Sequence, residues 1–206
     1  MAALAEMFLY GVVLAAQPGA AGGEPAAVPL LEERQAAARD SPTDPRVRME
    51  LGLAYLRAGE YELAMAELVE AIQLNPENKD NLAALANYHL GTALLALDRP
   101  ALAMDALRES LRLGWKDAGV YLALGQALTG QGKFDEAIVQ YREALRLAPA
   151  TADAYAGLGL ALEAAGRVDE AMANYERYLQ SAPAPDDHGA DAIRRRLAKL
   201  KERRKM

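Results

Sequence analysis

Cysteine is absent from this sequence of 206 residues, and histidine occurs only twice, as His89 and His188. The lack of thiols excludes disulfides, zinc–thiolate sites, iron–sulfur clusters and cysteine nucleophiles. Two imidazoles are too few for a multi-histidine metal site. We therefore expect no metal and no cofactor, and the lack of cysteine does not by itself assign the protein to a cell compartment.

Phenylalanine and tryptophan are also scarce, with two Phe and one Trp in the whole chain. The sequence has no runs in which Val, Ile or Thr alternate with polar residues, which is the pattern of a half-buried strand. Alanine and leucine dominate instead, and both favour helices. The composition therefore predicts an all-α protein.

Charge is unevenly distributed along the chain, whose net charge is −6. From Ala192 onward there are eight Lys or Arg and one Glu, so the rest of the chain is strongly acidic. Binding to nucleic acid requires a basic face that neutralises phosphates. An acidic body with a basic tail argues against a body that binds nucleic acid.

The N-terminal segment, residues 1 to 29, differs in kind from the rest. Its apolar run from Met7 to Ala16 is shorter than the roughly 20 residues that span a bilayer, and it has the length of a signal-peptide apolar region. The small residues of Val13-Leu14-Ala15 could form a cleavage site, whereas Glu6 stands where a signal peptide carries positive charge. We expect an exported, periplasmic or membrane-associated protein, with a cytoplasmic one as the alternative.

Beyond residue 29 the sequence repeats itself, which is the pattern of a repeat array. One set of three positions recurs four times: a Gly, an Ala twelve residues later, and a Pro or Trp twelve residues after that. These positions are Gly52, Ala64 and Pro76; Gly91, Ala103 and Trp115; Gly125, Ala137 and Pro149; and Gly159, Ala171 and Pro183. The glycines are 34 residues apart except between the first two, which are 39 apart. We expect the five extra residues, "KDNLA" at 79 to 83, to lengthen one helix at its N-terminal end.

Each unit contains two stretches with helical apolar spacing. In the third unit these are "AGVYLALGQALTGQ" and "FDEAIVQYREALRLA", joined by a turn around Gly132. The recurring Gly and Ala predict a close approach of the two backbones, with Leu or Tyr at the flanks. The pattern is therefore helix, tight turn, helix and Pro stop.

These positions resemble the tetratricopeptide repeat family. The stretch "ELGLAYLRAGEYELAMAELVEAIQLNP" at 50 to 76 and the stretch "ALGQALTGQGKFDEAIVQYREALRLAP" at 123 to 149 match its consensus closely, and the resemblance covers residues 45 to 185. The family's Trp near the start of each unit is missing, Trp115 replaces a Pro, and Tyr178 replaces a small residue. The resemblance implies a right-handed solenoid of stacked antiparallel helix pairs with flanking capping helices.

The predicted organisation follows from these periods. It consists of an apolar leader and linker (1–23), a half-repeat capping helix (24–44), a first repeat (45–78), a second repeat with an N-terminal extension (79–117), a third repeat (118–151), a fourth repeat (152–185) and a basic capping helix (186–206).

One stretch raises the alternative of an enzyme, because "GQALTGQGK" at 125 to 133 looks like a phosphate-binding loop. A phosphate-binding loop needs Lys and a hydroxyl residue after its second Gly, and Gln131 and Gly132 stand there instead. "GLGLAL" at 157 to 162 likewise lacks the third Gly of a dinucleotide site. Asp135 and Glu136 are better explained as acidic residues that stabilise a helix N-terminus than as catalytic groups. His89 is better explained as a packing or surface residue than as a ligand of a metal. We predict that the protein is not an enzyme.

The predicted function is a scaffold or adaptor that binds a peptide or helix of a partner protein. The resemblance implies a concave groove lined by the first helix of each repeat, here Arg46, Met49, Leu53, Arg57, Leu85, Tyr88, Thr92, Leu122, Gln126, Thr129, Asp153, Ala156, Leu160 and Glu163. Arg46 and Arg57 are its only cations, so the carboxylate clamp of some family members is not expected. Some of the leucines, Leu53 and Leu160 among them, could equally pack between repeats.

Two alternatives to this function remain open on the sequence. The apolar leader could anchor a membrane-associated assembly factor, or the basic C-terminal helix could contact anionic lipid or nucleic acid. Ile193, Leu197 and Leu200 form one apolar stripe in that helix, which favours a helix that seals the last repeat. The sequence does not identify the protein partner.

Overall fold

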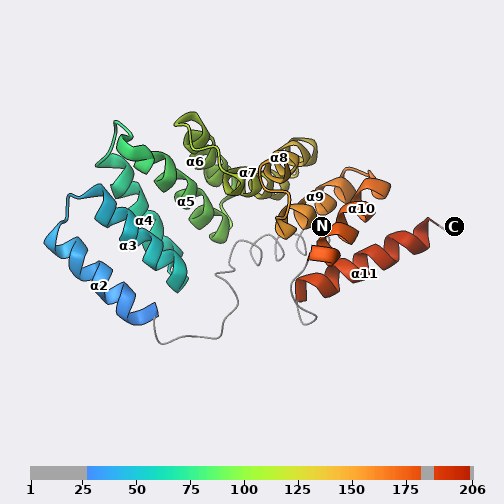
Figure 1. The fold of residues 1–206 in the computed structure, drawn as a ribbon, viewed down its shortest axis with the longest axis horizontal. Helices are drawn as coiled ribbons and strands as arrows, with labels where there is room; N and C mark the ends of the chain where they lie inside the picture. Colours follow the sequence, from blue (N-terminus) through green and yellow to red (C-terminus); the bar gives the residue numbers. More distant parts are fainter. Residues whose placement is uncertain (1–26, 182–187, 205–206) are drawn as a thin grey trace. The chain divides into compact units, whose positions relative to one another are not determined.

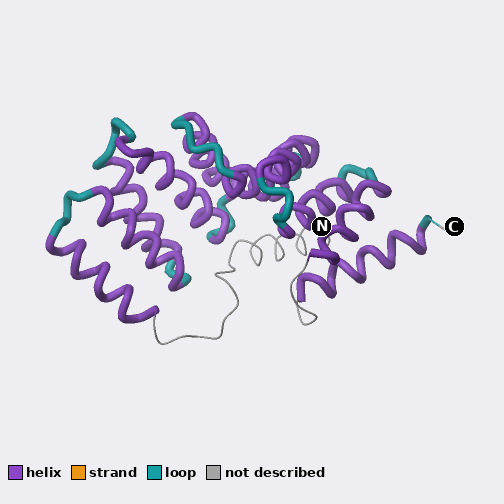
Figure 2. The backbone as a smooth tube through the Cα atoms, in the orientation of Figure 1, coloured by secondary structure: helices purple, strands orange, loops and turns teal. Residues whose placement is uncertain are grey.

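The computed structural model describes residues 27–181 and 188–204 of the chain. Every regular element in these residues is helical and none is a strand (Figure 2). The all-α prediction is therefore confirmed. The predicted leader, the first residues of the predicted half-repeat, and Pro183 lie outside the described residues.

The described residues form two compact units, which we treat separately. The described part of the N-terminal unit, residues 27–116, contains α2 (Ala27–Asp40), α3 (Pro45–Ala58), α4 (Tyr61–Gln73), the 3-10 turn η1 (Lys79–Asn81), α5 (Leu82–Ala96) and α6 (Pro100–Arg112) (Figure 1). The described part of the C-terminal unit, residues 117–181 and 188–204, contains α7 (Ala118–Gly130), α8 (Phe134–Leu147), α9 (Ala152–Ala164), α10 (Val168–Ser181) and α11 (His188–Arg203).

Helix pairs are the basic unit of both parts. The first helices α3, α5, α7 and α9 each pack against the second helix that follows, and α2 packs against α3 as α11 does against α10. Local signals set the helix ends: the Asp117 carboxylate accepts a hydrogen bond from the Gly119 amide at 2.8 Å at the start of α7. Gly132, at φ 73°, supports the turn before α8.

The stretch "GQALTGQGK" belongs to this helix-and-turn geometry. Its residues are helical up to Gly130, and Gly125 is buried inside α7. The amide of Gly132 donates to the Thr129 carbonyl at 2.9 Å in the closing turn. A phosphate-binding loop would follow a strand, and here the stretch continues a helix.

The recurring Gly of each first helix makes room for a large side chain of the second helix sixteen residues later. A Cβ at Gly91 would lie 2.5 Å from Leu107 Cγ, and one at Gly125 would lie 2.7 Å from Tyr141 Cε1. The recurring Ala is fully buried in each second helix, and a Cβ at Gly52 would also lie 3.4 Å from the Ala64 carbonyl oxygen. The side chain of Leu or Tyr is the nearest neighbour in the space that each Gly leaves.

The five extra residues before the second repeat lengthen α5 only in part: Leu82 and Ala83 belong to its first turn, whereas the preceding three residues do not. Asn78, Asp80 and Asn81 have positive φ values, and Lys79–Asn81 form a separate 3-10 turn before α5 begins at Leu82. The Asn78 side chain stabilises this turn, because its Oδ1 accepts a hydrogen bond from the Ala84 amide at 2.9 Å. Asn and Asp tolerate the left-handed conformation better than other non-glycine residues, which explains why this sequence breaks the helix.

Tyr141 provides a direct test of the Gly contacts, because its ring also packs against Gly157 of α9. A Cβ at Gly157 would lie 2.5 to 2.9 Å from Cε1, Cζ and Oη of Tyr141. We predict that Gly157→Ala lowers the free energy of unfolding by about 1–3 kcal/mol through overpacking. The same change should cost much less in a Tyr141→Leu background, because leucine lacks those three atoms; urea unfolding measures both.

Gly132→Ala is the matched control for this cycle. A Cβ at Gly132 meets nothing within 4 Å, and the positive φ of 73° alone opposes the substitution. Its cost, about 1–2 kcal/mol, should be the same in both backgrounds. Equal costs of Gly157→Ala in the two backgrounds would contradict the packing account.

Candidate functional site

The predicted groove residues lie on four first helices, two in each unit. In the N-terminal unit, α3 and α5 pack directly against one another, and in the C-terminal unit α7 and α9 do so. We use the name "first-helix face" for the surface of the N-terminal unit formed by Leu53, Arg57, Leu85, Tyr88 and Thr92. Arg57 is exposed and the other four are partly buried.

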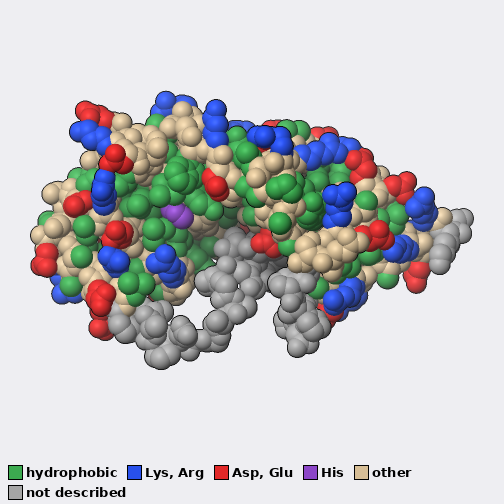
Figure 3. Space-filling view, in the orientation of Figure 1, with side chains coloured by type: hydrophobic (Ala, Val, Ile, Leu, Met, Phe, Trp, Pro, Cys, Tyr) green, Lys and Arg blue, Asp and Glu red, His purple; other side chains and the backbone are tan. Residues whose placement is uncertain are grey.

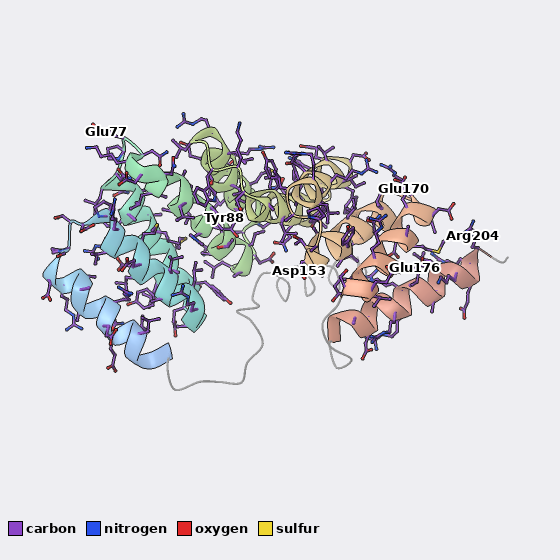
Figure 4. All side chains as sticks on the ribbon, in the orientation of Figure 1. Glu77, Tyr88, Asp153, Glu170, Glu176 and Arg204 are labelled. Carbon is purple, nitrogen blue, oxygen red and sulfur yellow. The ribbon has the colours of Figure 1, made fainter. Side chains whose placement is uncertain are left out.

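Apolar side chains dominate the surface of this unit around the first-helix face. Figure 3 shows hydrophobic side chains gathered over this part of the chain, with a histidine among them, and Figure 4 places Tyr88 on α5. Helix α5 has no Asp, Glu, Lys or Arg anywhere along its length. The face thus combines apolar area with the hydroxyl groups of Tyr88 and Thr92.

Two predicted groove residues of α3 make contacts within the unit. Arg46 is exposed and forms an ion pair with Asp80 of the inserted turn. Met49 is partly buried and packs against the buried cluster that contains Leu68 and Leu82. Their place in the groove stays a prediction.

His89 is the feature of this region that the sequence did not reveal. Its ring lies against Tyr88 with 4.8 Å between the centroids, and its carbonyl accepts a hydrogen bond from the Thr92 hydroxyl at 2.7 Å. Burial, and then the charge of Arg57, lower the pKa of His89 to about 4. His89 is therefore neutral at neutral pH. The sequence spacing within one repeat could not reveal the effect of Arg57 on this pKa, because α3 and α5 belong to different repeats.

Helix α7 contributes Leu122, Gln126 and Thr129, all partly buried. The hydroxyl of Thr129 lies 3.3 Å from the Tyr141 hydroxyl and shares a hydrogen bond with it. Thr129 therefore helps to hold the ring that fills the space beside Gly125. On α9, Asp153 is partly buried.

The rest of α9 departs from the predicted groove. Ala156 and Leu160 are buried, at 2% and 6% exposure, and so offer no accessible contact surface in this structure. Glu163 accepts a hydrogen bond from the Tyr175 hydroxyl at 2.6 Å and pairs with Arg196 at 3.4 Å. These contacts tie α9 to α10 and α11. Burial removes Ala156 and Leu160 from the predicted groove, whereas Glu163 is partly exposed and its contact role stays a prediction.

The basic C-terminal helix seals the last repeat, as its apolar stripe predicts. Ile193, Leu197 and Leu200 are buried. The cations around the stripe pair with acids of this unit: Lys201 lies 2.7 Å from Glu176 and Arg204 lies 3.3 Å from Asp169. Figure 4 labels Glu176 on α10 and Arg204 at the end of α11. Together with the Arg196 pair, these ion pairs engage three of the eight cations of this segment with acids of the same unit.

Two further kinds of site are missing from residues 27–181 and 188–204. There, no three His, Asp or Glu side chains are grouped so that they could hold a metal ion. No helix of the same residues is both long and apolar enough to cross a membrane.

Comparison with known proteins agrees with the helix pairs. Two sequence models, both of the tetratricopeptide repeat, match residues 24–85 and 122–188. The chain belongs to the tetratricopeptide repeat family. The first of these matches includes α2, so the tetratricopeptide pattern extends over the helix that precedes the first complete repeat.

Solved tetratricopeptide structures share this fold. A crystal structure of MamA is 28% identical, with a TM-score of 0.64, and the match covers 73% of this chain and 85% of that one. YrrB, described as a tetratricopeptide protein with an unusual peptide-binding site, is 22% identical, with a TM-score of 0.66 and coverages of 82% and 86%. TTC0263 of Thermus thermophilus is 24% identical, with a TM-score of 0.62 and coverages of 83% and 88%. A search of curated proteins found no match to this chain.

The lowered pKa of His89 has a consequence for stability. Because the folded pKa of about 4 lies below the ordinary value of 6.5, the unfolded chain binds more protons between these pH values. We predict that the stabilisation present above pH 6.5 is lost as the pH falls toward 4. Chemical unfolding at several pH values should show a steeper loss for the wild type than for His89→Gln, which cannot titrate.

Nuclear magnetic resonance titration of the imidazole gives a second measurement. The pKa of His89 should rise in Arg57→Gln, because a positive charge near the ring has been removed. An ordinary pKa in the wild type would contradict the burial of His89.

Proposed function

We propose that this protein is a non-enzymatic scaffold that binds a peptide or helix of a partner protein on its first helices. The tetratricopeptide fold supports interaction with a protein or peptide in general. The finer proposal rests on one observation, the partly exposed apolar and hydroxyl side chains of the first-helix face. The peptide-binding site ascribed to YrrB is consistent with this use of the fold.

The chemistry of the face favours a partner held mainly by buried area. Leu53 and Leu85 offer apolar surface, and Tyr88 offers a large ring with a hydroxyl group. Aromatic side chains of this kind often supply a large share of interface energy. An extended or amphipathic helical peptide could cover such a surface with its apolar side chains.

The basic helix α11 carries no second proposal. Its apolar stripe is buried and several of its cations pair with α9 and α10. An anionic lipid or nucleic acid would have to compete with these pairs.

The test of the proposed function is truncation of Tyr88. We predict that Tyr88→Ala weakens binding of a captured partner by about 1–2 kcal/mol, because a large contact area is removed, and leaves the thermal melt nearly unchanged. The partner is first isolated with the wild-type full chain and its affinity is then measured by calorimetry. Gln126→Ala in α7 tests the C-terminal unit in the same way.

Leu102→Ala is the matched control. Leu102 is 53% exposed on the second helix α6, so its truncation removes a comparable apolar surface away from the first helices. If Leu102→Ala weakens binding and Tyr88→Ala does not, the second helices form the working surface and the proposal is wrong.

A further inference from the structure

The solvent side of α11 carries basic side chains that are not neutralised within the described residues. Four cations at this end are paired with acids, namely Arg194 with Asp191, Arg196 with Glu163, Lys201 with Glu176 and Arg204 with Asp169. Arg195, Lys199 and Arg203 are exposed and make no ion pair within residues 27–181 and 188–204. We refer to these three residues as the basic outer stripe.

Helix geometry places the basic outer stripe on one side of α11. Its members follow one another at intervals of four residues, and residues at this spacing share a helix face. The apolar stripe that contains Ile193 and Leu197 is buried, so the packed side of α11 is a different one. Glu202 is the one acid of α11 that has no ion pair within the described residues.

Helix α2 has the opposite charge on its solvent side. Glu32, Glu33 and Asp40 are exposed and make no ion pair within the part of the chain that the structure describes. We refer to these three residues as the acidic outer face. Of the two cations of α2, Arg34 pairs with Glu50 of α3 at 2.6 Å, whereas Arg39 is exposed and donates to the Gln35 carbonyl at 3.2 Å.

The acidic outer face and the basic outer stripe match in length as well as in sign. Glu32 and Asp40 are eight residues apart, as are Arg195 and Arg203, which is about 12 Å along a helix. The exposed Ala36 lies between the acids of α2 on the same side, so a second helix can approach closely there. Unlike charges of matching extent attract each other.

The two helices also have equivalent places in the repeat array. Helix α2 packs against α3 and helix α11 packs against α10, and each repeat of a solenoid contacts only its neighbours along the chain. The solvent sides of α2 and α11 are therefore the sides on which a further repeat would stack. Caps of like charge would keep two copies apart, whereas these two caps differ in sign.

We propose that the acidic outer face of one copy binds the basic outer stripe of a second copy, so that chains associate head to tail. This interface uses neither α3 nor α5 and thus goes beyond the proposed function. A head-to-tail contact leaves one unused end of each sign, so further copies can add. Exposed ion pairs are individually weak and are screened by salt, so the association is weak and depends on ionic strength.

Sedimentation velocity of the full chain tests the salt dependence first. At low salt the average mass should grow with protein concentration. Raising the salt from about 0.01 M to about 1 M shortens the screening length from about 30 Å to about 3 Å. We expect the dissociation constant to rise about tenfold or more over this range, because the contact rests on charge. A chain that stays monomeric at low salt, or associates equally well at both salt concentrations, contradicts the proposal.

Reversal of charge at each end tests which faces meet. The α2 variant carries Glu32→Lys, Glu33→Lys and Asp40→Lys, and the α11 variant carries Arg195→Glu, Lys199→Glu and Arg203→Glu. Each variant alone should be monomeric at low salt, because its two ends then carry the same sign. A mixture of the two variants should associate again, because each end of one variant meets an end of opposite sign on the other.

A control variant separates this contact from an effect of net charge. Glu62→Lys, Asp105→Lys and Asp135→Lys change the net charge as the α2 variant does, at exposed positions of α4, α6 and α8, and should leave association unchanged. Thermal melts establish that each variant is folded. If a reversed variant unfolds, Glu32→Gln with Glu33→Gln should still weaken association, because it removes charge without reversing it.

Four other results would overturn the proposal. If the control variant weakens association as much as the α2 variant, net charge is responsible. If both reversed variants associate like the wild type, the copies meet elsewhere. If only the α11 variant loses association, its cations serve an acid other than those of α2. If both variants are monomeric and their mixture is too, the two faces do not bind each other.

Discussion

The contact between each recurring Gly and a large side chain of the following helix is the constraint on which the rest of this structure depends. Gly52 and Gly91 accommodate Leu68 and Leu107, and Gly125 and Gly159 accommodate Tyr141 and Tyr175. Interiors are packed too densely to absorb an extra methyl group without displacement. These contacts fix how closely, and at which residues, the two helices of a repeat pack against one another. They thereby determine which residues of the first helix remain on the surface. The first-helix face exists because the opposite side of α3 and α5 is committed to this packing.

Charge is distributed unevenly among the helices, and the first helix α3 carries ion pairs of its own. The first helix α5 carries none, whereas the second helices and α11 carry ion pairs such as Arg112 with Glu109 at 2.6 Å and Lys201 with Glu176 at 2.7 Å. Exposed pairs of this kind contribute little stability individually. The first-helix face carries one charged side chain, the exposed Arg57, among apolar and hydroxyl-bearing ones.

The repeat period predicted the helix pairs, the turn at Gly132 and the buried stripe of α11, because these features depend on local spacing. The sequence did not predict the break at Asn78 to Asn81, since the absence of Pro and Gly there hid a run of residues that tolerate positive φ. It also placed Ala156 and Leu160 in a groove by family position. The structure buries both, because their burial arises only when α9 packs against its neighbouring helices. The effect of Arg57 on the pKa of His89 joins residues of different repeats and was equally invisible to a reading of one repeat at a time.

The central claim is that the partner lies on the first helices of the N-terminal unit. Site-specific photocrosslinking from single positions measures this most directly, with a photoreactive residue at 85 or 92 on α5 and, in separate proteins, at 63 on α4 or 102 on α6. The account predicts that a bound peptide is crosslinked from the Leu85 and Thr92 positions and not from those of Leu63 and Leu102, which are exposed on second helices. Crosslinks from α4 and α6 with none from α5 would contradict it.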